Sequence, residues 1–292
     1  MLTNIVLAAL GVITLIFAVF YIKDVIAAKK QGSLGEGNFV IAGVSGFVVN
    51  FFDTLGIGAF APLTALLKGF KLTRDKYIPG TLNVSCTIPV VLEAFIFIDG
   101  IEVEPVTLIS MLAAAAIGAV VGAGFVSKLD EKKIQLFMAI ALLAVSLIML
   151  ASQLGLMPIG GEAIGLTGGK LIFAVVANFI LGALMTVGIG LYAPCMALVY
   201  ALGMSPAVAF PIMMGSCAFL MPSASLKFVK EGAYDKKAAI AITIFGSIGV
   251  FIAAYLVKSL PLEILKWLVV IVILYTSITM FKSYSNKAKV AK

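Results

Sequence analysis

The sequence predicts an all-α polytopic membrane protein built from inverted repeats. Hydrophobic residues make up 62% of the chain and charged residues only 12%, whereas soluble domains contain roughly 45–50% and about 25%. The apolar residues form spans long enough to cross a bilayer. In addition, the stretch Thr54–Pro62 returns 132 residues later as Thr186–Pro194.

The two stretches differ only at their second, sixth and seventh positions. Each one contains Gly-x-Gly followed by a proline inside an apolar segment, and this combination interrupts a helix. The same interruption in two matching places predicts two copies of one structural unit.

A membrane-crossing helix requires about 20 apolar residues, and this length divides the chain. We predict an N-terminal transmembrane helix and cytoplasmic loop, a first repeat, a linker, and a second repeat with a cytoplasmic tail. Their ranges are 1–37, 38–155, 156–169 and 170–292. The segment Met1–Phe20 lacks the basic leader and cleavage site of a secretory signal, so we expect it to be retained as a span.

Each repeat begins with an overlong apolar segment that contains the interruption, at about 38–70 and 170–203. Three plain spans follow each of these segments. They are expected at about 77–98, 105–127 and 133–155, and at about 205–229, 236–258 and 261–281.

Loop charge predicts the orientation. The loops after the spans ending near 22, 70, 127 and 229, together with the tail, hold 18 of the 21 basic residues if Lys227 is counted with its loop. The exceptions are Lys170, Lys258 and Lys266. The positive-inside rule can hold for all of them only if each overlong segment enters and leaves on one face. We therefore predict two re-entrant hairpins that approach from opposite faces of the plasma membrane, with the N-terminus outside and the C-terminus cytoplasmic.

One hairpin plus three crossings is an odd number of traverses, so the second repeat would run inverted relative to the first. Inverted repeats with broken helices are typical of secondary transporters, whose site lies near the bilayer midplane. Irregular backbone at that depth requires protein or water around it.

Several function classes are not expected. The chain has no histidine, and Cys86, Cys195 and Cys217 are widely spaced in apolar segments, so neither a metal site nor a disulfide framework is indicated. No nucleophile–base pair suggests an enzyme, and no cofactor is expected. The net charge of +7 follows from the basic loops, so nucleic acid is not an expected partner.

The chemistry of the interruptions favours an anion. Glycines let the backbone approach a ligand closely, and a proline suits the start of a new helix. Half-helices that begin near Pro62 and Pro194 would direct free N–H groups and positive dipole ends at a shared site. The simpler alternative is that the glycines only pack the hairpins tightly.

Polar residues of the following spans could donate to anion oxygens or only join helices. The candidate substrate-binding residues are Thr54, Gly56, Gly58, Phe60, Pro62, Asn83, Ser85, Cys86, Thr186, Gly188, Gly190, Tyr192, Pro194, Ser216 and Cys217. The small-residue runs Ala113–Ala116 and Gly118–Gly124 are expected to be packing faces.

Asp53 precedes the first interruption, whereas Met185 occupies the matching position in the second. An intramembrane carboxylate is a functional candidate, here for a coupling proton or cation. The alternative is an aspartate wetted at the rim of a re-entrant loop. Glu93 and Lys227 lie near the ends of their spans, and we expect both at the membrane interface.

The paired Gly-x-Gly-x-x-x-Pro elements, Gly56–Pro62 and Gly188–Pro194, resemble the sulfite exporter TauE/SafE family of membrane permeases. The resemblance covers about Asn38 to Lys282, with the first span as an addition. It implies ion-driven transport of small anions such as sulfite, thiosulfate, sulfoacetate or other organosulfonates. Family members commonly have a longer run of glycines at the turn, where this chain has Ala59-Phe60 and Leu191-Tyr192. The bulky side chains of Phe60 and Tyr192 would narrow the pocket or form an aromatic wall.

We therefore expect a secondary transporter of a small sulfur oxyanion, organosulfonate or organic acid, with alternating access around the two tips. An anion channel with the same tips as a filter is the alternative, and a scaffold protein is a weaker one. The expected partners are the anion, a coupling proton or sodium ion, and the lipid bilayer. A homodimer is a further expectation for assembly.

Overall fold

The computed structural model describes residues 2–55, 57–97, 102–156, 160–188, 190–256 and 263–290. These residues form α-helices and one short 3-10 helix, and they contain no strand beyond one isolated bridge. The predicted all-α class is therefore confirmed. The elements are α1 Leu2–Lys30, α2 Phe39–Thr54, α3 Phe60–Gly69, η1 Asp75–Tyr77, α4 Ile78–Phe97, α5 Pro105–Val126, α6 Glu131–Gln153, α7 Gly168–Met185, α8 Tyr192–Ala201, α9 Pro206–Lys230, α10 Lys236–Leu256 and α11 Glu263–Val290.

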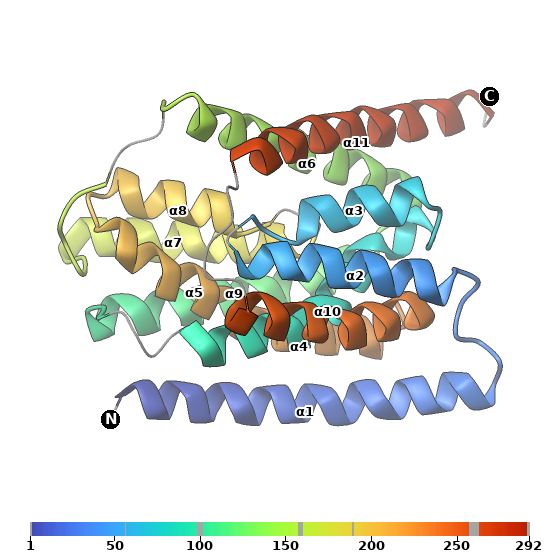
Figure 1. Cartoon of the computed structure of the whole chain (residues 1–292), viewed down its shortest axis with the longest axis horizontal. Coiled ribbons are helices and arrows are strands. Elements are labelled where there is room, and N and C mark those ends of the chain that lie inside the picture. The colour runs from blue at the N-terminus through green and yellow to red at the C-terminus, as the bar shows by residue number, and fades with distance from the viewer. Residues whose placement is uncertain are drawn as a thin grey trace.

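Within the described residues, seven helices are long and apolar enough to cross a membrane: α1, α4, α5, α6, α7, α9 and α10. The chain is thus a polytopic membrane protein. Both overlong segments are divided as predicted, into α2 and α3 and into α7 and α8. Figure 1 shows α2 and α3 entering the bundle from one end and α7 and α8 from the other, while the two chain termini lie at opposite ends.

Helix packing follows the order of the elements in both halves. Helix α2 packs along α10 as α7 packs along α5, and α4 contacts α10 as α9 contacts α5. The pairs α4–α9 and α6–α11 join equivalent helices of the two halves. The set of contacts is therefore largely preserved when the halves are exchanged, and α1 lies outside this relation, mainly against α9. The inverted orientation of the halves in a bilayer remains a prediction.

Glycines bring the backbones of the paired helices together. A Cβ atom at Gly118 would lie 2.0 Å from the carbonyl oxygen of Phe179, and one at Gly46 would lie 2.6 Å from Cα of Ile242. No side chain fits at these distances, so the α5–α7 and α2–α10 contacts require glycine. This agrees with the expectation that Gly118–Gly124 is a packing face.

Helices α4 and α9 form the interior of the bundle. Most residues of α4 and α9 are buried, whereas only a minority of the residues of α1 and α7 are. These two inner helices carry many of the buried polar side chains and contain the prolines Pro89, Pro211 and Pro222. Polar groups and helix-breaking prolines are tolerated at this depth because neighbouring helices satisfy them.

The linker between the halves is anchored rather than loose. The Glu104 backbone N–H donates to the Ile164 carbonyl (2.9 Å), and the Leu166 N–H donates to Thr107 Oγ1 (2.9 Å). The Glu104 carboxylate also caps α5, where it accepts from the N–H groups of Val106 (3.0 Å) and Thr107 (2.7 Å). The hydrogen bonds from Thr107, and then from Val106, lower the pKa of the Glu104 carboxyl.

We predict that Glu104→Gln lowers the melting temperature at neutral pH, because it weakens the α5 cap and its attachment to the linker. Folding lowers the pKa of the Glu104 carboxyl, so the ionised cap stabilises the fold at any pH above the ordinary pKa of a glutamate. This stabilisation is lost as the pH falls through the lower pKa of the folded state. The difference from the wild type should therefore shrink on acidification. Thermal unfolding in detergent measures it, with the exposed neighbour Glu102→Gln as control; equal shifts in both variants would contradict the prediction.

Candidate functional site

Both interruptions form sharp turns between helices. Helix α2 ends at Thr54 and α3 begins at Phe60, with Gly58 at φ +90° between them. Helix α7 ends at Met185 and α8 begins at Tyr192, with Gly188 at φ +110°. Only glycine adopts such φ values readily, which explains why a glycine is needed in each turn.

Each new helix starts inside the protein without a side-chain cap. The N-cap residues are Ala59 and Leu191, and neither offers a capping side chain. The prolines Pro62 and Pro194 are the third residues of their helices, where a missing N–H removes no intrahelical bond. The free N–H groups and the positive ends of the two helix dipoles therefore point into the centre of the bundle.

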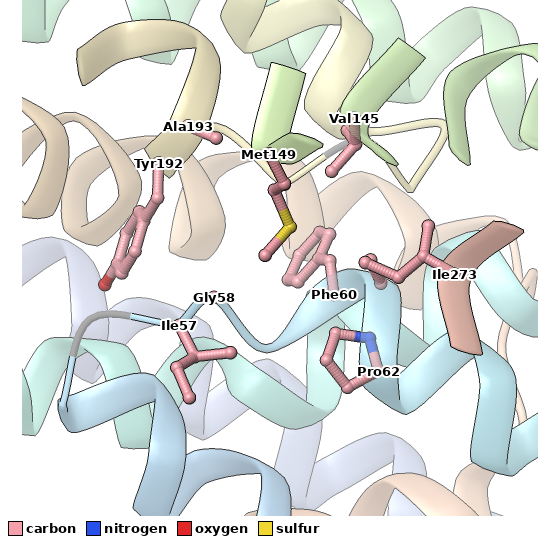
Figure 2. Close-up of a pocket in the computed structure, with 11 residues that line it drawn as sticks. Ile57, Gly58, Phe60, Pro62, Val145, Met149, Tyr192, Ala193 and Ile273 are labelled. Atoms are coloured by element: carbon pink, nitrogen blue, oxygen red, sulfur yellow. The ribbon is translucent and has the colours of Figure 1, made fainter. Parts of the chain in front are cut away.

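The two turns, here called tip 1 (residues 55–60) and tip 2 (residues 186–192), meet each other. A Cβ atom at Gly190 would lie 4.0 Å from Cβ of Phe60. Two cavities of about 20 Å³ each lie between the tips. Figure 2 shows one of them, bordered by Phe60 from tip 1 and Tyr192 from tip 2, with Met149 of α6. Each cavity holds about one water molecule, so the tips are closed against a larger ligand in this conformation.

Several of the predicted site residues border these two cavities. They are Asp53, Gly58, Phe60, Pro62, Gly190, Tyr192 and Cys217. Gly56 lies outside the described residues. The roles of all of them in substrate binding remain predictions.

Other predicted residues are engaged in helix contacts. Ser216 accepts from Asn178 Nδ2 of α7 (2.9 Å), and the Thr186 hydroxyl donates to the Ala183 carbonyl (2.6 Å). A Cβ atom at Gly188 would lie 3.0 Å from Cε of Met138. These contacts correspond to the simpler alternative of helix joining.

Further predicted site residues, three on α4 and one on α8, differ in their surroundings. Asn83 Nδ2 donates to the Pro79 carbonyl (2.8 Å), while its buried Oδ1 has no partner among the described residues. The carbonyl of Ser85 accepts from Thr243 of α10 (3.0 Å). Cys86 is buried beside Asn50 and within the electrostatic range of Asp53. Pro194 is partly buried in the first turn of α8.

The expectation that Glu93 lies at the membrane interface is wrong. Its side chain is fully buried in α4 and contacts both hairpins. Glu93 Oε1 lies 2.8 Å from Thr54 Oγ1, and Glu93 Oε2 accepts from the Tyr192 hydroxyl at 3.2 Å. Nearness to the predicted end of the span was misleading. The sequence held one signal for a central position of Glu93. Glu93 lies seven residues, or about two helical turns, after the candidate residue Cys86, so both lie on the same face of α4.

Lys227, by contrast, is partly exposed in the last turn of α9, with its Nζ 3.8 Å from Glu231 Oε1. This position is compatible with the expected interfacial placement.

Asp53 is also buried, with 3% of its surface exposed, so the description as a wetted rim residue does not apply. Its side chain borders one of the tip cavities together with Ala59 of tip 1, and it lies close enough to Glu93 for the two carboxyl groups to interact electrostatically. The described residues place no lysine or arginine in an ion pair with either carboxylate. The centre of the protein thus combines two helix N-termini with two acidic side chains.

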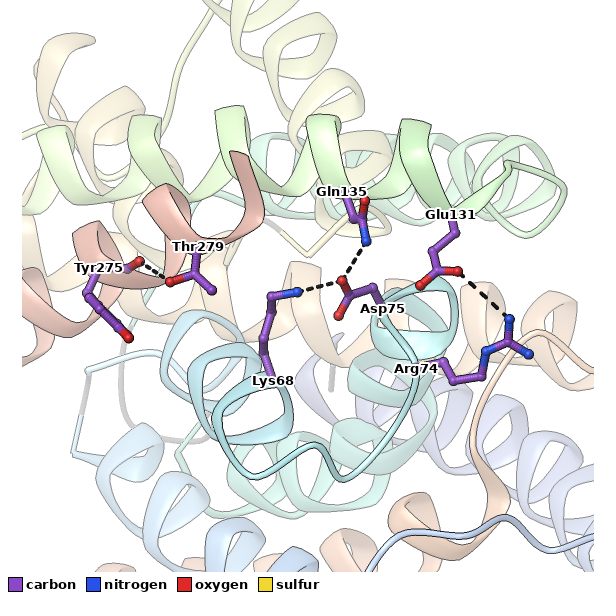
Figure 3. A network of polar contacts seen from close by, with 7 residues as sticks. All are labelled: Lys68, Arg74, Asp75, Glu131, Gln135, Tyr275 and Thr279. Carbon is purple, nitrogen blue, oxygen red and sulfur yellow. Dashed lines mark hydrogen bonds and ion pairs between the residues drawn. The ribbon is translucent and has the colours of Figure 1, made fainter. Parts of the chain in front are cut away.

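A larger cavity of about 350 Å³ opens beside the far end of α3, between α3 and α11. Its wall includes Leu66, about one helical turn beyond the tip-cavity residue Pro62, and also Lys68. Lys68 Nζ lies 2.5 Å from Asp75 Oδ2, which also accepts from Gln135 Nε2 at 2.7 Å (Figure 3). The α3–α11 seam therefore has cavities at the tips and at the end of the bundle.

Broken helices that meet in the interior of a polytopic helical bundle define a protein of the membrane-transporter class. A family model described as sulfite exporter TauE/SafE matches residues 1–149 and 171–292, so the chain belongs to this family. Membership implies a membrane transporter of sulfur anions rather than an enzyme. The match begins at residue 1, so α1 is part of the family pattern and not an addition to it. Comparisons with curated proteins and with solved structures found no match.

We predict that Tyr192→Phe destabilises the protein, because it removes the hydrogen bond that joins tip 2 to Glu93. Leaving a buried acceptor without its donor costs about 1–3 kcal/mol. Thermal unfolding in detergent should show a lower midpoint than the wild type. Tyr255→Phe, at a tyrosine that is 67% exposed on α10, serves as the control; an equal midpoint for both variants would refute the contribution of this bond.

Proposed function

We propose that the protein is a secondary transporter of a small anion, either a sulfur oxyanion or an organosulfonate or organic acid, and that the anion binds between tip 1 and tip 2. The observation that carries the proposal is the meeting of two uncapped helix starts from opposite hairpins. Backbone N–H groups and helix dipoles at such starts attract negative charge. Family membership supports sulfur-containing anions as the first class to test.

Alternating access would operate by separation of the tips. In the present conformation the space between them is too small for a sulfur oxyanion, so binding requires the hairpins to move apart. The cavity between α3 and α11 supports a route from tip 1 to the end of the bundle where α3 ends. By the positive-inside rule, the basic loops support an orientation with this end on the cytoplasmic side of a plasma membrane and the N-terminus outside. The coupling ion is a proton or sodium.

Purified protein in proteoliposomes provides the direct test. A panel of sulfite, thiosulfate, sulfoacetate and simple carboxylates is offered with an imposed proton or sodium gradient. Accumulation of one anion above its external concentration supports the transporter. Flux that only equalises the concentrations identifies the alternative, an anion channel with the same tips.

We predict that Gly190→Leu abolishes anion uptake while the protein still folds. Gly190 does not have a left-handed backbone, and a Cβ atom there meets only Phe60, at 4.0 Å. The added Cβ atom therefore displaces no backbone, and the rest of the leucine side chain occupies the space between the tips. Gly169→Leu is the matched control, because a Cβ atom at Gly169 meets no atom within 4 Å. Normal uptake of every anion by well-folded Gly190→Leu would show that the tips are not the site.

A further inference from the structure

Glu93 links the two hairpins through one carboxyl group. Its Oε1 contacts Thr54 at the end of α2, and its Oε2 contacts Tyr192 at the start of α8, at 2.8 Å and 3.2 Å. All three side chains are buried. Any movement that separates tip 1 from tip 2 must therefore break at least one of these two contacts.

The hydroxyl of Thr54 indicates where a proton lies. Thr54 Oγ1 is 2.8 Å from the Asn50 carbonyl oxygen and also 2.8 Å from Glu93 Oε1. A hydroxyl has only one proton to donate. Both contacts are hydrogen bonds if Thr54 donates to the Asn50 carbonyl while a protonated Glu93 donates to Thr54 Oγ1. Glu93 Oε2 then accepts from the Tyr192 hydroxyl.

The surroundings of Glu93 also favour its neutral form. The titratable groups that face it are Asp53 from α2, Tyr192 from α8, Cys217 from α9 and, on α4 itself, Cys86. All of these groups are neutral or negative, and both carboxyl groups are buried. An ionised carboxylate in such a site has no opposite charge to offset its lost hydration.

We propose that Glu93 is the proton-binding site of the transporter and that the protein moves its anion together with this proton. The proposal rests on the anion-transport function proposed above. An anion between the tips repels an ionised Glu93 and tolerates a protonated one, so anion binding and proton binding favour each other. The proton binds at Oε1 of Glu93 while the site is open to one side of the membrane. It leaves when the tips separate toward the opposite side, so the anion and the proton cross in the same direction.

Glu93→Gln is the informative variant because its amide imitates the protonated carboxyl. The amide nitrogen can donate to Thr54 Oγ1 and the amide oxygen can accept from Tyr192. The fold should therefore persist while the proton site is lost. Asp53→Asn tests whether the proton belongs to the neighbouring carboxyl instead, and Glu162→Gln in the exposed linker is the control.

Infrared spectroscopy of the purified protein at neutral pH measures the proton without any transport. We expect the carbonyl stretch of a protonated carboxyl group in the wild type, in Glu162→Gln and in Asp53→Asn, and its loss in Glu93→Gln. Absence of this band in the wild type would overturn the proposal. Loss of the band in Asp53→Asn with retention in Glu93→Gln would assign the proton to Asp53 and overturn it as well.

Transport in proteoliposomes gives the second measurement. For each variant, accumulation of the anion is compared with and without an inward proton gradient. The gradient should raise accumulation in the wild type and in Glu162→Gln, and the ratio should fall to one in Glu93→Gln. A gradient response of wild-type size in Glu93→Gln would overturn the proton site. A wild type that moves no anion would refute the proposed function, while the infrared result would still decide where the proton lies.

Discussion

The constraint on which this structure depends is that backbone N–H and C=O groups cannot be left unsatisfied in the hydrocarbon core of a membrane. Two helices nevertheless stop and restart in the interior, at tip 1 and tip 2. The surrounding helices make this possible. Helices α4 and α9 enclose the tips, while glycines such as Gly46 and Gly118 let α10 and α5 pack directly against the first arm of each hairpin. Close packing thereby keeps lipid away from backbone that is not in a helix.

This constraint also explains how much of the fold could be predicted. Hydrophobic length located the helices, since a span must match the bilayer, and the repeated Gly-x-Gly and proline located both breaks because few residues adopt φ near +90°. Loop charge predicted that the two hairpins approach from opposite faces of the membrane, and in the structure they enter the bundle from opposite ends. The anchored linker was not predictable, because the bonds of Glu104 and Thr107 to residues 164–166 depend on the three-dimensional position of α5.

The candidate site was less accessible from the sequence. Asp53 and the tip residues could be identified because they lie in or next to the repeated stretch. Glu93 could not be identified in this way, since its importance comes from contacts with Thr54 and Tyr192, which are 39 and 99 residues away. Likewise, nothing in the sequence separated Cys217, which borders a tip cavity, from Ser216, which binds Asn178 on α7. Adjacent helical residues point to different neighbours, and only the packing decides which of them meets the site.

The difference between the tips now has a physical meaning. In tip 1 the Asp53 side chain borders the cavity together with Ala59, the residue before α3, so an acidic group lies beside the helix start that would attract an anion. In tip 2 the matching residue is Met185, which carries no charge and lies 3.8 Å from Cys217 through its sulfur. Under the proposed function, an incoming anion would meet the carboxyl group of Asp53 at tip 1 and the uncharged Met185 at tip 2. Because the Tyr192 hydroxyl at the start of α8 donates to Glu93, an anion bound at tip 2 as proposed would lie next to the proton that we assign to Glu93. Under the proposed function, the asymmetry therefore lies in Asp53 alone, because Glu93 contacts both hairpins and only tip 1 has an acidic residue directly before its turn.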